Sequence, residues 1–211
     1  MRRLPVYLLL DTSGSMRGEP IEALQNGLHV LINMLRQDPY ALETVHLSIL
    51  TFDADAKVIV PLTPLDQVQV PIISCPQSGP THLGLALERL ASQVGRELIR
   101  STADRKGDWA PLLFVMTDGK PSDLQLFEEQ SQVVRSIGFA TIVGCVAGPK
   151  VRKDDIAPLC DQIVAMDVMD SAAFAGFFKW VTQTVATGSR SMGAASAVSL
   201  PPPPAEIQLV H

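Results

Sequence analysis

Short runs of apolar residues alternate along the chain with longer stretches in which apolar residues recur at every third or fourth position. Such short runs are typical of buried strands, and the periodic stretches are typical of amphipathic helices. The pattern predicts strands over Val6–Leu10, Val45–Phe52, Lys57–Leu62, Leu112–Met116, Thr141–Val146 and Ile163–Met166. It predicts helices over Pro20–Arg36, Leu83–Ile99, Leu126–Ile137 and Phe174–Val185, and a short one over Lys153–Leu159.

Alternation of strands and helices predicts a doubly wound, Rossmann-like α/β/α fold with a mostly parallel, six-stranded sheet. The residues Asp53–Asp55 separate two predicted strands by a turn short enough for a hairpin, so we expect one antiparallel edge strand. We expect a domain over residues 1–187 and a flexible tail rich in Gly, Ala, Ser and Pro over residues 188–211. The run Pro201–Pro204 favours an extended spacer, although it could also dock into an aromatic groove.

The composition narrows the classes of partner. The chain has 211 residues, of which 46% are hydrophobic, and a formal net charge of −5, which disfavours binding to nucleic acid. Its first apolar run stops at Asp11, too early for a secretory signal, and no run approaches the roughly 18 apolar residues of a membrane span. We therefore expect a soluble, cytoplasmic protein without a membrane partner.

The first chemically suggestive segment follows the first predicted strand. Asp11, Ser13 and Ser15 alternate with other residues, so their side-chain oxygens can converge on one point, and Gly14 permits a tight curve between the serines. Carboxylate and hydroxyl oxygens are hard ligands that suit Mg²⁺, Mn²⁺ or Ca²⁺. The same residue types also cap helices, so the segment alone leaves both interpretations open.

Two further segments favour the metal interpretation. Asp118 follows another apolar strand, which places it at the same edge of a parallel sheet as Asp11, and two facing carboxylates favour a balancing cation. Lys120 is close in sequence and could neutralise Asp118 instead. Thr81 precedes a predicted helix, where its hydroxyl could cap that helix or act as another neutral ligand.

Together, these three segments resemble the metal-ion-dependent adhesion site of von Willebrand factor A domains over roughly residues 4–187. Asp11 to Ser15 match the Asp-x-Ser-x-Ser element, Thr81 matches the single threonine, and Asp118-Gly119 match the Thr-Asp-Gly element. The resemblance implies one divalent cation, most often Mg²⁺, held by Asp11, Ser13, Ser15, Thr81 and Asp118. It also implies an open coordination position that accepts an acidic or phosphorylated group of a protein partner.

Within that family, residues 4–21 and the strand Leu47–Phe52 resemble the bacterial TerY-type tellurite-resistance proteins. This resemblance implies a cytoplasmic role in tellurite resistance and stress response. It implies partners among tellurium-resistance proteins, a protein kinase or a metal-dependent phosphatase, and links to phosphorylation signalling.

An enzyme is the competing interpretation, in the form of a Mg²⁺-dependent phosphate-ester hydrolase. A haloacid-dehalogenase arrangement would place its general acid where this chain has Ser13, and the chain has neither a Gly-x-x-x-x-Gly-Lys phosphate loop nor a dinucleotide fingerprint. His82 could serve as a general base, but a capping or surface histidine is the commoner outcome. The three cysteines fit small buried hydrophobes better than a disulfide or a thiolate metal site. We therefore expect a binding module and not an enzyme.

Overall fold

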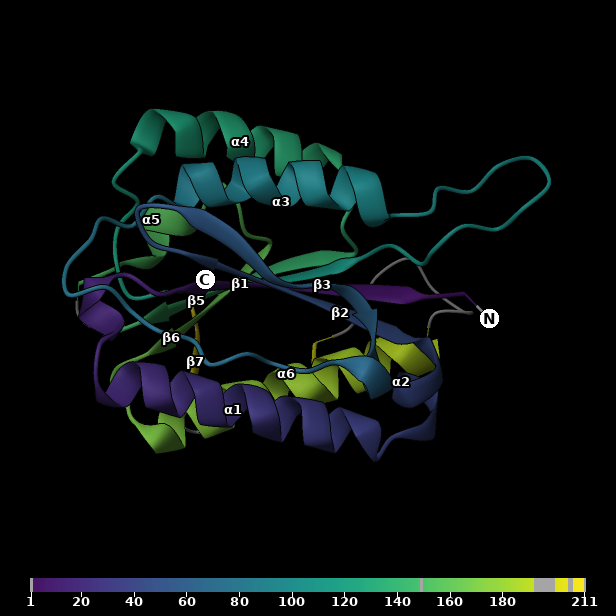
Figure 1. The fold of residues 1–211 in the computed structure, drawn as a ribbon, viewed down its shortest axis with the longest axis horizontal. Coiled ribbons are helices and arrows are strands. Elements are labelled where there is room, and N and C mark those ends of the chain that lie inside the picture. Colours follow the sequence, from purple (N-terminus) through teal and green to yellow (C-terminus); the bar gives the residue numbers. More distant parts are fainter. Residues whose placement is uncertain (1, 149, 192–199, 205–206, 211) are drawn as a thin grey trace.

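A computed structural model of the chain describes residues 2–148, 150–191, 200–204 and 207–210. It shows one mixed sheet between two layers of helices (Figure 1). The strands are β1 (Leu4–Asp11), β2 (Val45–Phe52), β3 (Ala56–Pro64), β4 (Leu112–Thr117), β5 (Thr141–Ala147), β6 (Gln162–Met166) and β7 (Gln208–Val210). The helices are α1 (Glu19–Arg36), α2 (Pro39–Thr44), α3 (Leu83–Glu97), α4 (Leu124–Ser136), α5 (Lys153–Ile156) and α6 (Ser171–Ser191), with 3-10 turns η1 (Gly14–Met16) and η2 (Leu65–Gln67).

The strand order is β3-β2-β1-β4-β5-β6-β7, and the five strands from β2 to β6 are parallel to one another. β1 therefore lies between β2 and β4, and the chain winds outward from it in both directions. In such sheets, the crevice at the carboxyl ends of the two strands where the winding reverses is the usual ligand site. Asp11 ends β1, and Asp118 follows β4, so both acids lie at this crevice.

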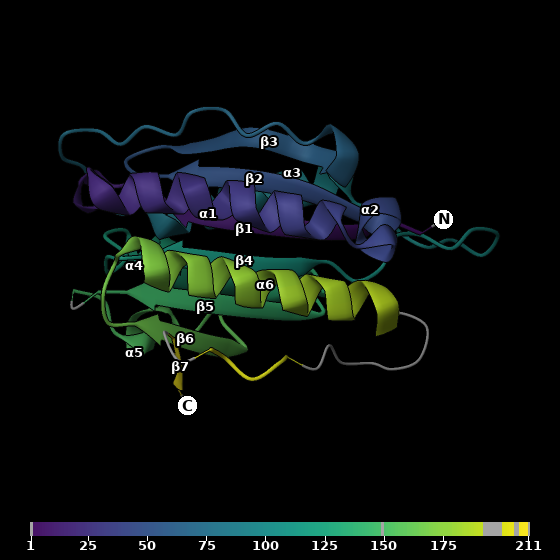
Figure 2. The ribbon, with the colours of Figure 1, turned by 90° about the horizontal axis from the view of Figure 1, so that it is seen from below.

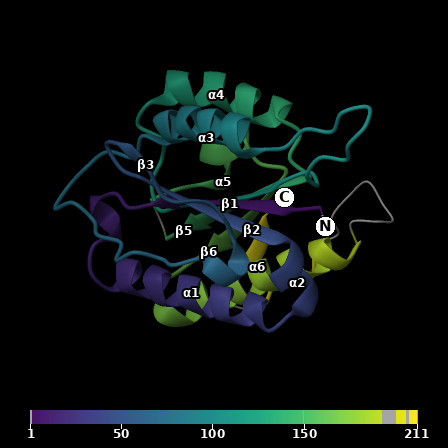
Figure 3. The same cartoon turned by 45° about the vertical axis from the view of Figure 1, so that its right-hand side comes forward.

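Alternate residues of β1 belong to two different cores. Val6, Leu8 and Leu10 pack with the layer of α1 and α6, whereas Tyr7 and Leu9 pack with the layer of α3 and α4. This alternation follows from the two-residue period of a strand, and it explains why the entire strand is buried. Figure 3 shows the sheet between the two helical layers.

Helices α1 and α6 run side by side across one face of the sheet (Figure 2). A Cβ atom on Gly27 of α1 would lie 2.3 Å from the ring of Phe178, so a larger residue at this position would push the two helices apart. In the part of the chain that the structure describes, no helix combines the length and the apolar character needed to cross a bilayer.

The structure confirms the doubly wound fold but corrects the expected number of strands from six to seven. The seventh strand, β7, pairs antiparallel with β6, so both edges of the sheet are antiparallel. It forms within the segment expected to be a flexible tail, because Ile207 is buried and Leu209 packs against the core, which holds the chain against the free edge of β6. Helix α6 also continues past the expected domain boundary at residue 187.

The proline run is likewise attached to the domain. The indole Nε1 of Trp180 donates a hydrogen bond of 2.8 Å to the carbonyl of Pro201, and Leu200 packs against the core. Residues 192–199, 205–206 and 211 of the expected tail lie outside the described residues.

Candidate metal centre

The first loop of the site is anchored at both of its ends, to the sheet at one and in the core at the other. Thr12 donates from its backbone N–H and its hydroxyl to the carbonyl of Phe52 on β2, at 2.8 and 3.1 Å. Four residues later, Met16 is fully buried in the core. Between these anchors, the chain makes the 3-10 turn η1, which brings the hydroxyl oxygens of Ser13 and Ser15 to 3.2 Å from each other.

The first loop also packs directly against the loop that carries Thr81. A Cβ atom on Gly14 would lie 2.6 Å from the Cα of Ser78, so this contact between two backbones requires a glycine. The close approach keeps the serine hydroxyls and the Thr81 loop at one crevice.

The loops of Thr81 and Asp118 are joined by a reciprocal pair of hydrogen bonds. The N–H of Thr81 donates to the Ser122 hydroxyl at 3.2 Å, and the N–H of Ser122 donates to the Thr81 carbonyl at 2.9 Å. A Cβ atom on Gly119 would lie 2.7 Å from the Thr81 hydroxyl oxygen, so that hydroxyl lies directly beside the residue after Asp118.

The structure decides whether Thr81 caps helix α3. The N-cap residue of α3 is His82, whose side chain makes no capping hydrogen bond. The orphan N–H groups of Gly84 and Leu85 donate instead to the two carboxylate oxygens of Asp123, at 3.0 and 2.9 Å. The Thr81 hydroxyl is therefore not used as a cap, and its role as a metal ligand stays a prediction.

Both carboxylate oxygens of Asp11 have donors within the protein. Oδ1 accepts from the N–H of Ser13 at 2.8 Å, and Oδ2 accepts from the hydroxyl of Thr117 at 2.7 Å. Thr117 also accepts from the N–H of Gly119 at 3.2 Å, so it links the two acidic loops. Thr117 was not among the predicted ligands, although it ends β4 and is the threonine of the Thr-Asp-Gly element.

Only one of the two carboxylate oxygens of Asp118 has a hydrogen-bond partner. Its Oδ1 accepts from the Ser15 hydroxyl at 2.8 Å, whereas its Oδ2 has no hydrogen-bond partner. Within the described residues, this Oδ2 is the one side-chain nitrogen or oxygen atom that is buried without a partner. Since an unsatisfied buried carboxylate oxygen is costly, the donor set fits a cation that would bind there.

The electrostatic surroundings support the same conclusion. Asp11 and Asp118 are 0% and 1% exposed, and burial raises the pKa of Asp11 to about 6. Donors on Ser13 and Thr117 oppose this shift, and the charge of Asp118 adds to it. No ion pair to either acid occurs among the residues that the structure describes.

Lys120, the chain's own candidate for balancing Asp118, lies elsewhere. Its Nζ is 3.7 Å from Oδ1 of Asp155, the acid in the first turn of α5. The ammonium group is thus paired with an acid outside the predicted ligand set, and among the described residues it forms no ion pair with Asp118.

The alternatives from the sequence find little support in the geometry. His82 faces the carbonyl of Ala54 at 3.2 Å, on the turn between β2 and β3. Cys75, Cys145 and Cys160 are free thiols, and burial raises the pKa of each. In the described part of the chain, no three His, Cys, Asp or Glu side chains gather as they would in a thiolate or histidine metal site.

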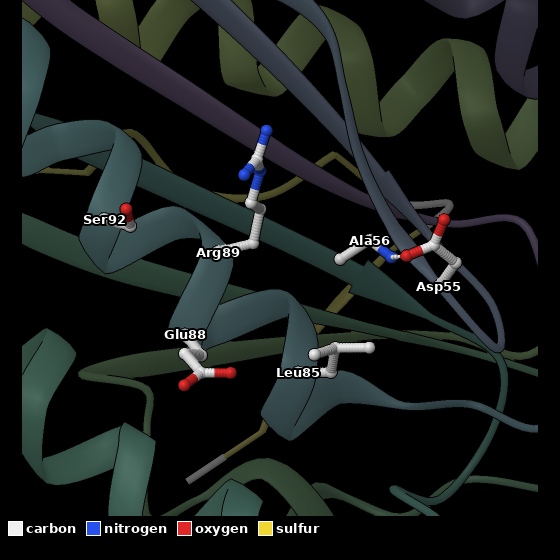
Figure 4. A pocket seen from close by; sticks show the side chains of 6 residues that line it. All are labelled: Asp55, Ala56, Leu85, Glu88, Arg89 and Ser92. Atoms are coloured by element: carbon white, nitrogen blue, oxygen red, sulfur yellow. Dashed lines mark hydrogen bonds between the residues drawn. The ribbon is translucent and has the colours of Figure 1, made fainter.

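A cavity lies nearby, between the turn at Asp55-Ala56 and helix α3 (Figure 4). Leu85, Glu88, Arg89 and Ser92 of α3 complete its lining. None of the five predicted ligands lines this cavity, so it is distinct from the crevice that holds Asp11 and Asp118.

Comparison with known proteins gives one family match. The model of the family described as von Willebrand factor type A domain matches residues 6–166. A curated relative, the uncharacterized protein sll0103 of Synechocystis sp., is 31% identical over 128 residues, which cover 56% of this chain and 26% of that protein. The chain therefore spans about a quarter of the length of this relative.

Solved structures share the fold. Proximal thread matrix protein 1 from the mussel byssus superposes with a TM-score of 0.65 at 16% identity. Its structure has a zinc-occupied MIDAS motif, that is, a metal-ion-dependent adhesion site. The match covers 88% of this chain and 48% of that one. A von Willebrand factor type A protein from Catenulispora acidiphila gives 0.64 at 16%, with 88% and 43% covered. The pilus adhesin SpaC of Lactobacillus rhamnosus GG gives 0.70 at 9%, with 89% and 31% covered.

Proposed function

The chain belongs to the von Willebrand factor type A family, and from this premise we propose that it is a metal-dependent protein-binding module. In this proposal, one divalent cation is held by Asp11, Ser13, Ser15, Thr81 and Asp118. When bound, the cation supplies a positive charge with an open coordination position for a carboxylate or phosphate of a partner protein.

One observation carries the proposal, namely the unpartnered Oδ2 of Asp118. Leaving one oxygen of a carboxylate buried to this extent without a cation or a donor costs several kcal/mol, by order of magnitude. Selection for folding alone would favour a residue without that cost. A hard cation at this oxygen removes the cost. The Ser15 hydroxyl donates its hydrogen to Oδ1 of Asp118, so its oxygen can serve as a neutral ligand of the same cation.

The chain's other residues position the ligands. Thr117 fixes the carboxylate of Asp11 through its hydroxyl, and Asp123 occupies the end of α3, which leaves the Thr81 hydroxyl for the cation. Because every side-chain donor in the predicted set is oxygen, the set favours Mg²⁺, Mn²⁺ or Ca²⁺ over softer ions. Because the mussel protein has zinc in this motif, the affinity for Zn²⁺ should be compared with the affinities for these three ions.

We propose a binding role rather than catalysis, since the two candidate acid–base groups beside the crevice in the described part of the chain both have other partners. His82 is engaged with the hairpin turn, and Lys120 is paired with Asp155. The resemblance of residues 4–21 to TerY-type proteins supports a finer proposal, a cytoplasmic role in tellurite resistance and stress response. Its partners would be tellurium-resistance proteins, a kinase or a phosphatase.

Calorimetry with Mg²⁺, Mn²⁺, Ca²⁺ and Zn²⁺ tests the metal site. We expect saturable one-to-one binding, and a rise in melting temperature with metal concentration because the ion binds the folded state. The isosteric change Asp118→Asn should lower the affinity at least about 100-fold, which corresponds to about 2.7 kcal/mol. Asp66→Asn is the matched control, since Asp66 is exposed and lies on η2, away from the site.

Binding of acidic peptides and phosphopeptides, measured with Mg²⁺ and with EDTA, tests the open coordination position. We expect binding with Mg²⁺ that EDTA and Asp118→Asn both abolish. Equal binding in all three conditions would contradict the proposal, as would metal binding that survives Asp118→Asn unchanged.

A further inference from the structure

A projecting loop, residues 99–108, lies at the opposite end of the sheet from the metal crevice. We call it the finger; it connects α3 to β4 and extends well beyond the body of the protein (Figures 1 and 3). The carboxyl ends of β1 and β4 form the end that we call the metal pole, and the finger precedes the amino end of β4. One molecule therefore presents the metal crevice and the finger in opposite directions.

The base of the finger is closed by hydrogen bonds between its two ends. The N–H of Asp108 donates to the carbonyl of Ile99 at 2.8 Å, and the N–H of Ile99 donates back to Oδ2 of Asp108 at 2.8 Å. The N–H of Gly107 donates to the hydroxyl of Ser101 at 2.9 Å. A Cβ atom on Gly107 would lie 2.3 Å from the Ile99 carbonyl, so this closure requires a glycine.

The N-terminal arginines brace this base from outside. Arg3 donates to both carboxylate oxygens of Asp108, at 2.8 and 2.6 Å. Arg2 donates to the carbonyls of Gly107 and Asp108, and its guanidinium lies 3.6 Å from the ring centroid of Trp109. With these contacts, the finger is a supported projection, which lowers the entropic cost of binding through it.

The tip of the finger presents a carboxylate. The N–H of Thr102 donates to the carbonyl of Arg105 at 2.9 Å, which leaves Ala103 and Asp104 at the turn. Every residue from Arg100 to Lys106 is exposed. No hydrogen bond or ion pair of the Asp104 carboxylate occurs among the described residues.

The charges around this carboxylate complement those at the metal pole. Arg100, Arg105 and Lys106 flank Asp104, so the sides of the finger are basic. At the metal pole, the exposed acids include Asp55 of the β2–β3 turn and Glu19 of the first turn of α1, beside the exposed base Arg17, whereas the base Lys120 is paired with Asp155. Basic groups beside an acidic surface favour association and set its orientation.

The shapes also correspond. Several exposed or half-exposed residues around the metal crevice are small, namely Ser15, Ser78, Gly79 and Gly119, and the larger Arg17, His82 and Lys120 lie in the same loops. Small residues at the rim admit a narrow projection that reaches inward, whereas a flat surface could not bring a carboxylate to the buried Asp118. The finger is such a projection, and its acid stands at the tip.

We propose that the partner of the metal site is a second copy of this chain, whose finger places Asp104 on the cation. This inference rests on the proposed function, because the cation accepts the Asp104 carboxylate. Arg105 and Lys106 of one copy then face the acids of the metal pole of the next copy. Because the two surfaces differ and lie at opposite ends, the contact is head-to-tail and extends into chains of molecules.

Sedimentation over a series of protein concentrations tests the proposal. With Mg²⁺, the average mass should rise above that of a dimer, and EDTA or high salt should return it to that of a monomer. Asp104→Asn should stay monomeric while it binds Mg²⁺ as tightly as the unaltered chain. Asp66→Asn, a change of another exposed acid, should assemble normally.

Mixing two variants gives a sharper test of the head-to-tail geometry. Asp104→Asn keeps the metal site, and Ser15→Ala keeps the finger but loses a predicted ligand, so each alone should be monomeric. Their mixture should form one-to-one dimers and nothing longer, since each variant offers a single working surface.

The outcomes separate this inference from the proposed function. If the chain binds Mg²⁺ but stays monomeric at every concentration, the self-association is wrong and the metal-dependent module stands. Assembly that persists in EDTA or in Asp104→Asn also overturns the inference. Failure to bind metal in calorimetry overturns the proposed function, and the inference with it.

Discussion

Asp108 and Asp118 are nearly buried carboxylates at opposite ends of the sheet, and they differ in whether a basic side chain of the protein pairs with them. Asp108 is 4% exposed in its side chain and accepts two hydrogen bonds from Arg3. Asp118 is 1% exposed, receives one hydroxyl, and meets no basic side chain in the described part of the protein. Within the described residues, the chain supplies a cation for Asp108 and none for Asp118, which is the contrast expected between a structural carboxylate and the metal-binding one that we propose.

The largest expected effect is a loss of folding stability when Asp108 loses its arginine partner. Arg3→Met should lower the free energy of unfolding by about 3 kcal/mol, because it leaves Asp108 buried without its cation. Urea unfolding followed by circular dichroism measures the loss, and Mg²⁺ affinity should not change. Arg135→Met is the control, because the Arg135–Asp161 pair is about half exposed and should contribute less than about 0.5 kcal/mol. Equal losses in the two variants would remove the distinction between Asp108 and an ordinary surface acid.

An intermediate effect is expected at the residue that positions Asp11. Thr117→Val keeps the shape of the side chain but removes the hydroxyl that donates to Oδ2 of Asp11, so Mg²⁺ affinity should fall about 10- to 100-fold. Titration calorimetry measures the change. Thr184→Val removes a buried hydroxyl bonded to a carbonyl of α6, away from the crevice, and should leave the affinity as it is. An unchanged Mg²⁺ affinity in Thr117→Val would show that the hydroxyl of Thr117 is not needed to position the carboxylate of Asp11.

The smallest effect is expected at Lys120. Because its ammonium group pairs with Asp155 and its side chain is more than half exposed, Lys120→Met should raise Mg²⁺ affinity by less than about threefold, or about 0.6 kcal/mol. Competition with a fluorescent Mg²⁺ indicator measures such a difference. A tenfold or greater rise would mean that Lys120 partly neutralises Asp118 in solution, and the contrast with Asp108 would then be weaker.

The sequence predicted the elements whose hydrophobic period is regular. The continuous run before Asp11 and the two parallel strands β4 and β5 occur within a residue or two of their predicted ends. β7 was missed because three residues carry no period of their own, and its position depends on the free edge of β6 and a buried Ile207. Helix α6 was predicted too short, since residues beyond Val185 have weaker periodicity.

For the site, the sequence predicted the three loops but not the contacts that join them. Asp123 precedes α4 and by position would be expected to cap that helix, yet its carboxylate caps α3. The reciprocal bonds between Thr81 and Ser122 join residues that are 41 positions apart. Such contacts depend on the tertiary arrangement, and a local pattern cannot anticipate them.

The two tryptophans of the chain give it a pair of built-in optical reporters. Trp109 stacks beneath Arg2 at the base of the finger, and Trp180 is buried with its indole bonded to Pro201. Neither belongs to a loop of the metal crevice. Emission from Trp109 would therefore follow events at the finger, emission from Trp180 would follow detachment of the C-terminal segment, and single replacements by phenylalanine would separate the two signals.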